Sequence, residues 1–236
     1  MSCDAYKERR HAMVETQLMA RGIADHAVLQ AMRSVPREAF VLPKDTALAY
    51  EDGALPIEEG QTISQPYIVA WMIEALQLAA HDRVLEIGTG SGYAAAVLSC
   101  IIKEVYTVER LAGLATQARQ RLHDLGYRNV EVLHVNGTLG WPAHAPYDGI
   151  VVTAGGPKVP EALQAQLVIG GRLVMPVGAS LRLQTLVRVT RTGDSAFRQE
   201  DLGAVSFVPL IGTQGWHGDE ADEGLGAWSL RMENDQ

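Results

Sequence analysis

The chain is poor in cysteine and has no long apolar run. Cys3 and Cys100 are its only two cysteines, which excludes a disulfide framework and a four-cysteine zinc site. The stretch Ala94–Ile102 includes Ser99 and is far shorter than the ~18 residues expected of a membrane span. Residues 1–10 contain no apolar core of a secretion signal. We therefore expect a cytoplasmic protein that does not enter a membrane.

Basic residues are also scarce relative to acidic ones. Lysine and arginine number 20 and aspartate and glutamate 28, which gives a formal net charge of −8. This excess disfavours a nucleic-acid binder, because general affinity for nucleic acid comes mainly from neutralising phosphates. The seven histidines show no metal-ligand spacing, so we expect no metal site. With 47% hydrophobic and 20% charged residues over 236 positions, the composition is that of a globular protein of one or two domains.

Hydrophobic periodicity divides the chain into three parts. Residues 1–60 carry apolar residues at helical spacing, broken by prolines, which predicts a helical segment packed on the main domain. Residues 61–212 are the expected main domain, in which short β-branched runs alternate with helical patterns from about residue 82 to 190, as is typical of βαβ units in a parallel sheet. Residues 213–236 are glycine-rich and acidic, and we expect a loosely ordered tail that Trp216 and Trp228 could tether.

The predicted architecture is a Rossmann-like α/β sandwich whose mostly parallel sheet ends in an antiparallel edge. Parallel strands are expected at 83–87, 105–108, 130–135, 149–153 and 172–176, and helices at 93–100, 111–125 and 159–169. A hairpin is expected to join strands 183–190 and 205–210 through the polar turn 192–194. In such folds, ligands bind outside the carboxyl ends of the strands.

A glycine-rich turn between a predicted strand and a predicted helix is the strongest local motif. Residues 84–93 read VLEIGTGSGY, with glycines at 88, 90 and 92, whereas a dinucleotide fingerprint needs its third glycine at 93. Glycines allow positive φ and a close approach of the backbone to a ligand. The spacing resembles the first motif of class I S-adenosylmethionine-dependent methyltransferases. A plain turn without a ligand is the alternative interpretation.

Polar residues follow the next two predicted strands. Glu109 ends the strand after the glycine turn, where an acidic side chain can accept hydrogen bonds from ribose hydroxyls. Asn136 and Gly137 follow the third strand, at the turn that lines the adenine pocket in these folds, and the Asn136 side-chain oxygen could accept from the adenine amino group. A solvated loop glutamate and an ordinary Asn-Gly turn are the alternatives.

A second motif lies upstream, where residues 60–67 read GQTISQPY. Ser64 is predicted to be a helix N-cap, with Pro66 in the first turn. Capping alone would explain the serine. A helix start directed at the cofactor would instead offer N–H groups and a hydroxyl to an anionic substrate.

Together these motifs resemble the protein-L-isoaspartate (D-aspartate) O-methyltransferase family over residues 10–212. The segment Thr62–Pro66 is the most specific, because generic methyltransferases lack it. Further matching segments are 69–70, 84–93, 108–110, 137–142, 145–148, 170–174, 176–178 and 205–210. The resemblance implies an S-adenosyl-L-methionine-dependent enzyme that methylates the free α-carboxylate of L-isoaspartyl residues in damaged proteins and peptides, as protein repair. It also implies that Ser64 is the active-site serine and that the glycines and Glu109 contact the cofactor.

The candidate site follows from the motifs and the resemblance. Ser64 is the catalytic candidate, and Thr62, Ile63 and Gln65 join it as candidate substrate-binding residues. The candidate cofactor-binding residues are Glu86, Gly88, Thr89, Gly90, Ser91, Gly92, Glu109, Arg110, Asn136, Gly137 and Thr153. The family usually has Gly-Asp-Gly where this chain has Val135-Asn136-Gly137, which predicts weakened rather than lost cofactor binding.

Two other functions stay open from the sequence. The first is a methyltransferase of another substrate, although amino-methylating relatives carry an Asn/Asp-Pro-Pro-aromatic motif where this chain has Thr153–Pro157, TAGGP. The second is a module that binds S-adenosyl-L-methionine without turnover, which Asn136 keeps open. If the chain is the isoaspartyl methyltransferase that the resemblance implies, we expect a monomer whose partners are isoaspartyl proteins and peptides.

Overall fold

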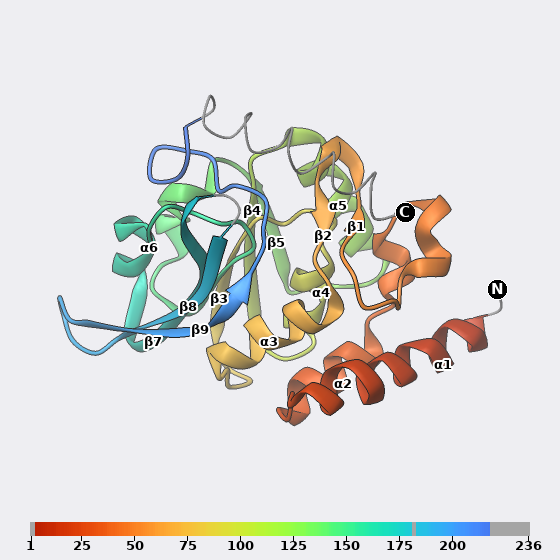
Figure 1. Ribbon diagram of the computed structural model, residues 1–236. Helices are drawn as coiled ribbons and strands as arrows, with labels where there is room; N and C mark the ends of the chain where they lie inside the picture. Colours follow the sequence, from red (N-terminus) through yellow and green to blue (C-terminus); the bar gives the residue numbers. More distant parts are fainter. Residues whose placement is uncertain (1–2, 181–182, 218–236) are drawn as a thin grey trace.

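The centre of the fold is a seven-stranded sheet in the order β5-β4-β3-β6-β7-β8-β9 (Figure 1). The structure is a computed structural model that describes residues 3–180 and 183–217. Strands β3 to β7 pair in parallel, and β8 and β9 add an antiparallel edge, so the predicted fold class is confirmed. The strands are β3 (Arg83–Ile87), β4 (Glu104–Glu109), β5 (Val130–His134), β6 (Tyr147–Val152), β7 (Leu167–Ser180), β8 (Leu183–Arg191) and β9 (Phe197–Val205).

Helices precede the sheet and connect its strands. They are α1 (Cys3–Met13), α2 (His26–Ser34), α3 (Pro66–Leu76), α4 (Tyr93–Ser99), α5 (Ala112–Asp124) and α6 (Glu161–Ala165). A separate two-stranded hairpin of β1 (Leu55–Pro56) and β2 (Thr62–Ile63) leads into α3. Within the described residues, no helix has the length and apolar character needed to cross a membrane.

The strands bury both of their faces, as parallel strands in such a sheet do. Val84 and Val151 face one core cluster, while their neighbours Leu85 and Ile150 face the other. The first cluster also contains residues of α2, α3, α4 and α5, whereas the second is covered by the short α6 and by loops. The sandwich is therefore covered unevenly, and most of its helices lie on one face.

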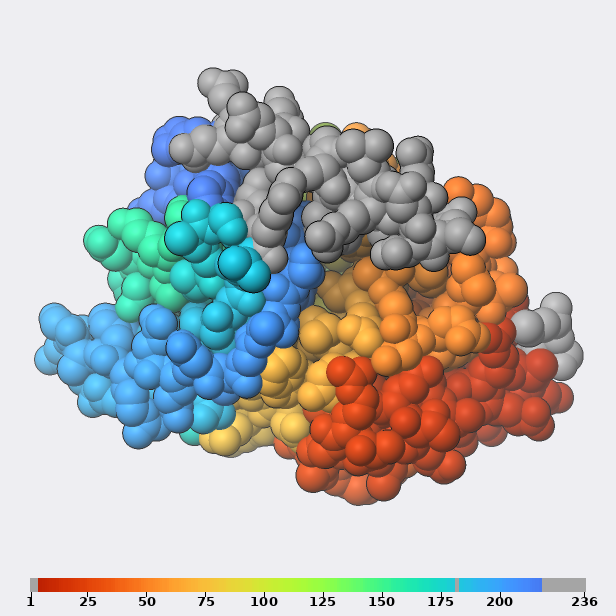
Figure 2. Space-filling model, viewed as in Figure 1, coloured from red at the N-terminus to blue at the C-terminus, as the bar shows by residue number. Residues whose placement is uncertain are grey.

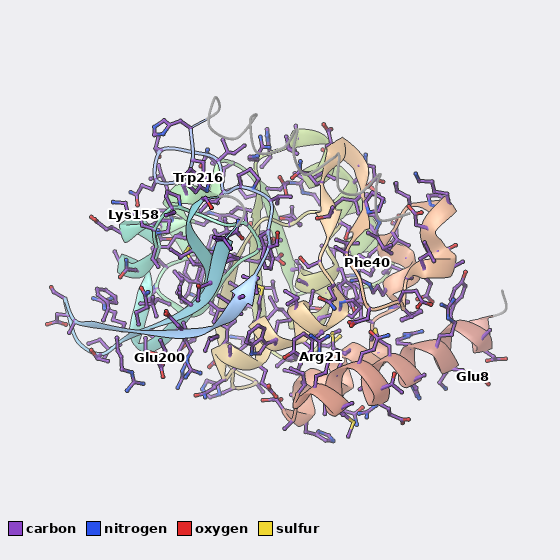
Figure 3. All side chains as sticks on the ribbon, viewed as in Figure 1. Glu8, Arg21, Phe40, Lys158, Glu200 and Trp216 are labelled. Atoms are coloured by element: carbon purple, nitrogen blue, oxygen red, sulfur yellow. The ribbon has the colours of Figure 1, made fainter. Side chains whose placement is uncertain are left out.

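The N-terminal helices pack on the helical face of the sheet. In the space-filling view, the red N-terminal helices lie against the yellow surface of α3 (Figure 2). Phe40, which belongs to the short turn η3 (Arg37–Phe40), has its ring centroid 5.6 Å from that of Tyr93 and 6.4 Å from that of Tyr127 (Figure 3). Asp25 caps α2 by accepting hydrogen bonds from the backbone N–H groups of Ala27 and Val28. The expected division of the chain at residues 60 and 212 stays a prediction.

One predicted helix is too long. Residues 159–169 were expected to be helical, but α6 spans only Glu161–Ala165, and Leu167 pairs with Tyr147 as the start of β7. A short apolar run suits a buried helix and a buried strand equally well, so periodicity does not distinguish them.

The last predicted strand is wrong. The chain turns as expected near Thr192, but β9 is Phe197–Val205, and the segment 206–211 leaves the sheet. This segment packs on the loop after β6, where the N–H of Gly155 donates to Val208 O at 2.8 Å and the N–H of Leu210 donates to Gly155 O at 2.8 Å. Pro209 cannot donate to a strand ladder, which is consistent with this departure.

Two side chains fasten residues 206–217 to the body of the protein. Gln184, which is 4% exposed, accepts from Phe207 N at 2.9 Å and donates to Phe207 O at 3.0 Å. The indole N–H of Trp216 donates to Gly155 O at 2.9 Å (Figure 3). Of the two expected tethers, Trp216 therefore makes this contact, while Trp228 and the rest of the expected tail lie outside the described residues.

Replacing Gln184 with leucine should destabilise the protein by about 1–3 kcal/mol, because both backbone polar groups of Phe207 lose a buried partner. Urea unfolding monitored by circular dichroism measures the change. Gln199→Leu on the exposed edge strand β9 is the matched control and should change the free energy of unfolding by less than about 0.5 kcal/mol. Equal effects of the two substitutions would contradict the role given to Gln184.

Candidate functional site

The site lies where the order of the strands reverses. The chain passes from β3 to β4 and β5 on one side and returns to β6 on the other side of β3. Ile87, the last residue of β3, pairs with Val108 on β4 and with Val152 on β6. The three loops after these strands therefore meet at one edge, which is where open α/β sheets bind ligands.

The glycine turn is anchored to both neighbouring strands. The backbone N–H groups of Gly88 and Thr89 donate to Val108 O at 2.9 and 3.2 Å. Thr153, which follows β6, donates from its hydroxyl to Gly88 O at 2.8 Å. Gly88 has φ +96°, and a Cβ at this position would lie 2.4 Å from Thr153 Oγ1. Only glycine fits here without displacing Thr153.

Glu109 turns its carboxylate toward the glycine turn. Its Oε2 accepts from Gly90 N at 2.9 Å, and its Oε1 accepts from Leu111 N at 3.0 Å. The residue is 6% exposed, yet it lines the pocket described below. A carboxylate has about four acceptor positions, so capacity remains for hydroxyl groups of a ligand.

Glu86 is a carboxyl group buried beneath the turn. It is fully shielded from solvent, and its Oε2 accepts from Thr107 Oγ1 at 2.6 Å. Burial raises the pKa of Glu86 to about 8, so the group is mainly protonated at neutral pH. Its Oε1 is buried and has no hydrogen-bond partner among the described residues.

These loops enclose a pocket at the carboxyl edge of the sheet. Its non-atom space, part of it open to solvent, is about 980 Å³. The predicted site residues that line it are Thr62, Ile63, Ser64, Glu86, Gly88, Thr89, Gly90, Ser91, Glu109, Arg110, Gly137 and Thr153. Two motifs separated by more than 20 residues, around Ser64 and around Gly90, thus face the same cavity.

The predicted capping role of Ser64 is wrong, although its position at the pocket is retained. Helix α3 begins at Pro66, and Gln65 is its N-cap residue, without a side-chain capping bond. A proline disfavours helical geometry at the residue before it, and Gln65 accordingly has φ −48° and ψ 138°. Ser64 therefore lies one residue outside the helix. Its hydroxyl has no hydrogen-bond partner among the residues that the structure describes.

Two of the predicted residues do not line the pocket but contact the elements around it. Gln65 donates from its side-chain amide to Asp52 Oδ1 at 2.6 Å. Gly92 has φ +91° and is the N-cap residue of α4, where a Cβ would lie 3.3 Å from the side chain of Leu122. The glycine allows α4 and α5 to pack closely.

Asn136 is the third predicted residue outside the pocket lining. Its Oδ1 accepts from Thr138 N at 3.0 Å and from Thr138 Oγ1 at 2.8 Å, and its amide donates to Ile211 O at 3.2 Å. This side chain therefore caps its own turn and holds the segment that follows β9. Its contact with adenine stays a prediction, and Gly137 is the residue of this dipeptide that lines the pocket.

Sequence reasoning missed part of the pocket wall. Residues 208–211 line the pocket, together with Met72 and Ile73 from α3. The apolar character of residues 205–210 predicted a strand, although Pro209 was a signal against a central strand. The apolar residues of α3 gave no signal that could separate a pocket wall from core packing.

The residues present fit S-adenosyl-L-methionine. The glycine turn allows a close approach of its backbone, and Glu109 retains acceptor capacity for ribose hydroxyls. The unpartnered Oε1 of Glu86 is a buried polar atom that a ligand or water would satisfy. Among the described residues, no group of three or more histidine, cysteine, aspartate or glutamate side chains could hold a metal ion.

Comparisons with known proteins agree on one family. The family profile for protein-L-isoaspartate(D-aspartate) O-methyltransferase matches residues 8–215. The chain is 64% identical over 219 residues to protein-L-isoaspartate O-methyltransferase 2 of Pelobacter propionicus, which covers 92% of this chain and 97% of that relative. It is also 64% identical over 209 residues to protein-L-isoaspartate O-methyltransferase 1 of Geotalea uraniireducens, covering 89% and 95% of the two chains.

Solved structures of similar proteins have the same fold. A protein-L-isoaspartate O-methyltransferase superposes with a TM-score of 0.78 and 31% identity, covering 89% of this chain and 67% of that chain. A β-aspartate methyltransferase from Plasmodium falciparum, in complex with S-adenosyl-L-homocysteine, superposes with a TM-score of 0.73. At 24% identity over 86% of this chain and 98% of that chain, the second similarity concerns the fold alone.

The buried carboxyl of Glu86 should make the stability of the ligand-free protein fall as pH rises. Its pKa is about 8 in the folded protein against an ordinary value of 4.5, so between these limits only the folded state holds the proton. The stabilisation is complete below 4.5 and is lost as pH rises through 8, with a slope of at most about 1.4 kcal/mol per pH unit.

Urea unfolding at about pH 5.5 and 8 tests this dependence. Between these two pH values, the free energy of unfolding of the wild type should fall by up to about 3 kcal/mol more than that of Glu86→Gln. The glutamine variant keeps a neutral side chain of the same shape. Glu161→Gln, at an exposed glutamate of α6, is the control and should behave as wild type does. Parallel pH profiles for wild type and Glu86→Gln would contradict a raised pKa.

Proposed function

This chain belongs to the protein-L-isoaspartate(D-aspartate) O-methyltransferase family, and we propose a role for each part of its pocket in that activity. The enzyme transfers a methyl group from S-adenosyl-L-methionine to the free α-carboxylate of L-isoaspartyl residues in damaged proteins and peptides. The observation that carries the proposal is that Ser64 and the turn Gly88–Ser91 line one pocket at the point where the strand order reverses.

The acceptor needs no general base. A substrate carboxylate has an ordinary pKa near 4, so it is already ionised at neutral pH. Bound S-adenosyl-L-methionine supplies an electrophilic methyl carbon, which a carboxylate oxygen takes while the carbon–sulfur bond breaks and its electron pair stays on sulfur. The protein then has to align and desolvate the two reactants, an effect that can supply roughly 7–11 kcal/mol.

We assign the orientation of the substrate carboxylate to Ser64. Its hydroxyl has no partner among the described residues, so it is available to donate to a carboxylate oxygen. Thr62 and Ile63 belong to β2, the short strand that leads to this serine, and they line the same pocket. A backbone in extended form suits a substrate in which damage can arise in any sequence.

The cofactor is assigned to the opposite part of the pocket. Glu109 would accept hydrogen bonds from the ribose hydroxyls, and the backbone of Gly88 and Gly90 would approach the cofactor closely. The free Oε1 of Glu86 would find a hydrogen-bond partner on the cofactor. Because burial keeps Glu86 mainly neutral, this contact would not add a negative charge to the pocket. Supporting this assignment, all four residues line the pocket.

The active form is proposed to be a cytoplasmic monomer. The low cysteine content favours a reducing compartment, and the net charge of −8 disfavours nucleic acid as a partner. Its proposed partners are the isoaspartyl proteins and peptides themselves.

Ser64→Ala should lower turnover by a factor on the order of 10 to 100, because a hydrogen bond to a charged group is worth about 1.5–3 kcal/mol. Cofactor affinity should change by less than about threefold. Transfer of a radiolabelled methyl group to an isoaspartyl peptide measures turnover, with the corresponding aspartyl peptide as the substrate control, and titration calorimetry measures cofactor affinity.

Ser99→Ala on α4 is the matched protein control, since Ser99 hydrogen-bonds its own helix and does not line the pocket. Equal loss of turnover and cofactor affinity in Ser64→Ala would mean that the serine has only a structural role. Cofactor binding without transfer to either peptide would favour a binding module, and transfer to another acceptor alone would favour a different substrate.

A further inference from the structure

A buried guanidinium lies directly behind the pocket wall. Arg37 is fully shielded from solvent. Its Nε donates to Ala49 O at 2.8 Å, and its Nη2 donates to Ser64 O at 2.8 Å. The side chain thus connects the N-terminal segment to the main chain of the serine that carries the proposed function.

The same guanidinium contacts a second part of the wall. Its central carbon lies 4.8 Å from the ring centroid of Tyr93, the first residue of α4, which lines the pocket. Arg37 therefore contacts one residue from each of the two motifs that form the pocket. Tyr93 follows the glycine turn, and Ser64 follows β2.

Core packing does not account for an arginine at this position. No carboxylate in the described part of the chain pairs with Arg37, and its Nη1 is buried without a hydrogen-bond partner. Glu38, the next residue in the chain, instead pairs with Arg10 and accepts a hydrogen bond from the hydroxyl of Tyr50. A buried cation without a paired anion is costly, and an apolar side chain of similar volume would fill the space without that cost.

The main chain at Ser64 needs an external support. Ser64 belongs neither to β2 nor to α3, and among the described residues it makes no backbone–backbone hydrogen bond. The hydrogen bond from Arg37 is therefore what holds its carbonyl. Because the Cα–Cβ bond is fixed to this backbone, the orientation of the peptide unit determines where the hydroxyl can point.

We propose that Arg37 is a positioning residue for methyl transfer, which holds the main chain of Ser64 so that the serine hydroxyl faces the acceptor carboxylate. This inference rests on the proposed role of Ser64. Arg37 does not line the pocket and touches neither reactant. It acts through Ser64, and a misplacement of about 1 Å at a reacting group can cost on the order of 100-fold in rate.

Arg37→Met tests the proposal because it keeps the volume and removes both hydrogen bonds. The kcat for an isoaspartyl peptide should fall on the order of 10- to 100-fold at a temperature where the variant is folded, while cofactor affinity stays within about threefold. Arg37→Lys keeps the charge but cannot bridge two carbonyls as a planar fork does, so its kcat should lie between those of wild type and Arg37→Met.

Arg10→Met is the matched control. Arg10 is 9% exposed and donates to Ser34 O at 2.6 Å. Its Nη2 lies 3.8 Å from Oε1 of Glu38, the residue next to Arg37 in the chain. It makes no hydrogen bond to Ser64. Its replacement should destabilise the protein in a similar way, yet kcat per folded molecule should stay within about twofold of wild type.

A double-mutant cycle shows whether Arg37 acts through the serine. In the Ser64→Ala background, Arg37→Met should lower kcat by less than about threefold, because the group that Arg37 positions is already gone. Independent effects would instead multiply, and that result would overturn the proposal. Unchanged kcat in Arg37→Met, or in Arg37→Lys if the methionine variant does not fold, would overturn it as well.

Failure of this inference is distinguishable from failure of the proposed function. If Ser64→Ala keeps full turnover, the role of Ser64 itself is wrong, and the role of Arg37 falls with it. If Ser64→Ala loses turnover while folded Arg37→Met and Arg10→Met both retain it, only the inference about Arg37 is wrong.

Discussion

Three neighbouring parallel strands end level with one another because Ile87 pairs with Val108 on one side and with Val152 on the other. This register brings together the glycine turn, Glu109 and Thr153, although they come from the ends of three different strands. A slip by one residue would turn alternate side chains to the opposite face, and Glu86 would leave the pocket for the second core. The chemistry of the site therefore depends on strand register before it depends on any single side chain.

The electrostatics of the pocket depend on the groups around it rather than on the net charge of the protein. The chain carries a formal charge of −8, yet its proposed substrate group is an anion. Within the pocket, burial keeps Glu86 mainly neutral, and Glu109 accepts hydrogen bonds from two backbone N–H groups. The guanidinium of Arg37 lies behind the wall near Ser64. A low-dielectric surrounding makes these local charges matter more than distant surface ones.

Much of the site could be predicted because its motifs are local. The glycine turn and Glu109 were correctly placed, since a strand, a tight turn and a helix leave a readable pattern over a few residues. Predictions failed where one pattern fits two structures. The apolar segment 205–210 suits a strand as well as a pocket wall, and Ser64 before Gln65-Pro66 suits a cap as well as an extended residue. Asn136 suits a ligand contact as well as the turn cap that the structure records, and its contact with adenine stays a prediction.

The sequence by itself determined the order of strands and helices, the glycine turn, and the family to which the chain belongs, because these depend on residues close together in the chain. Only the tertiary structure decided which residues share the pocket. The hydrogen bond from Arg37 to Ser64 and the anchoring of Phe207 by Gln184 join residues 27 and 23 positions apart. Such contacts form only when the sheet and its helices have packed, and no local pattern in the chain encodes them.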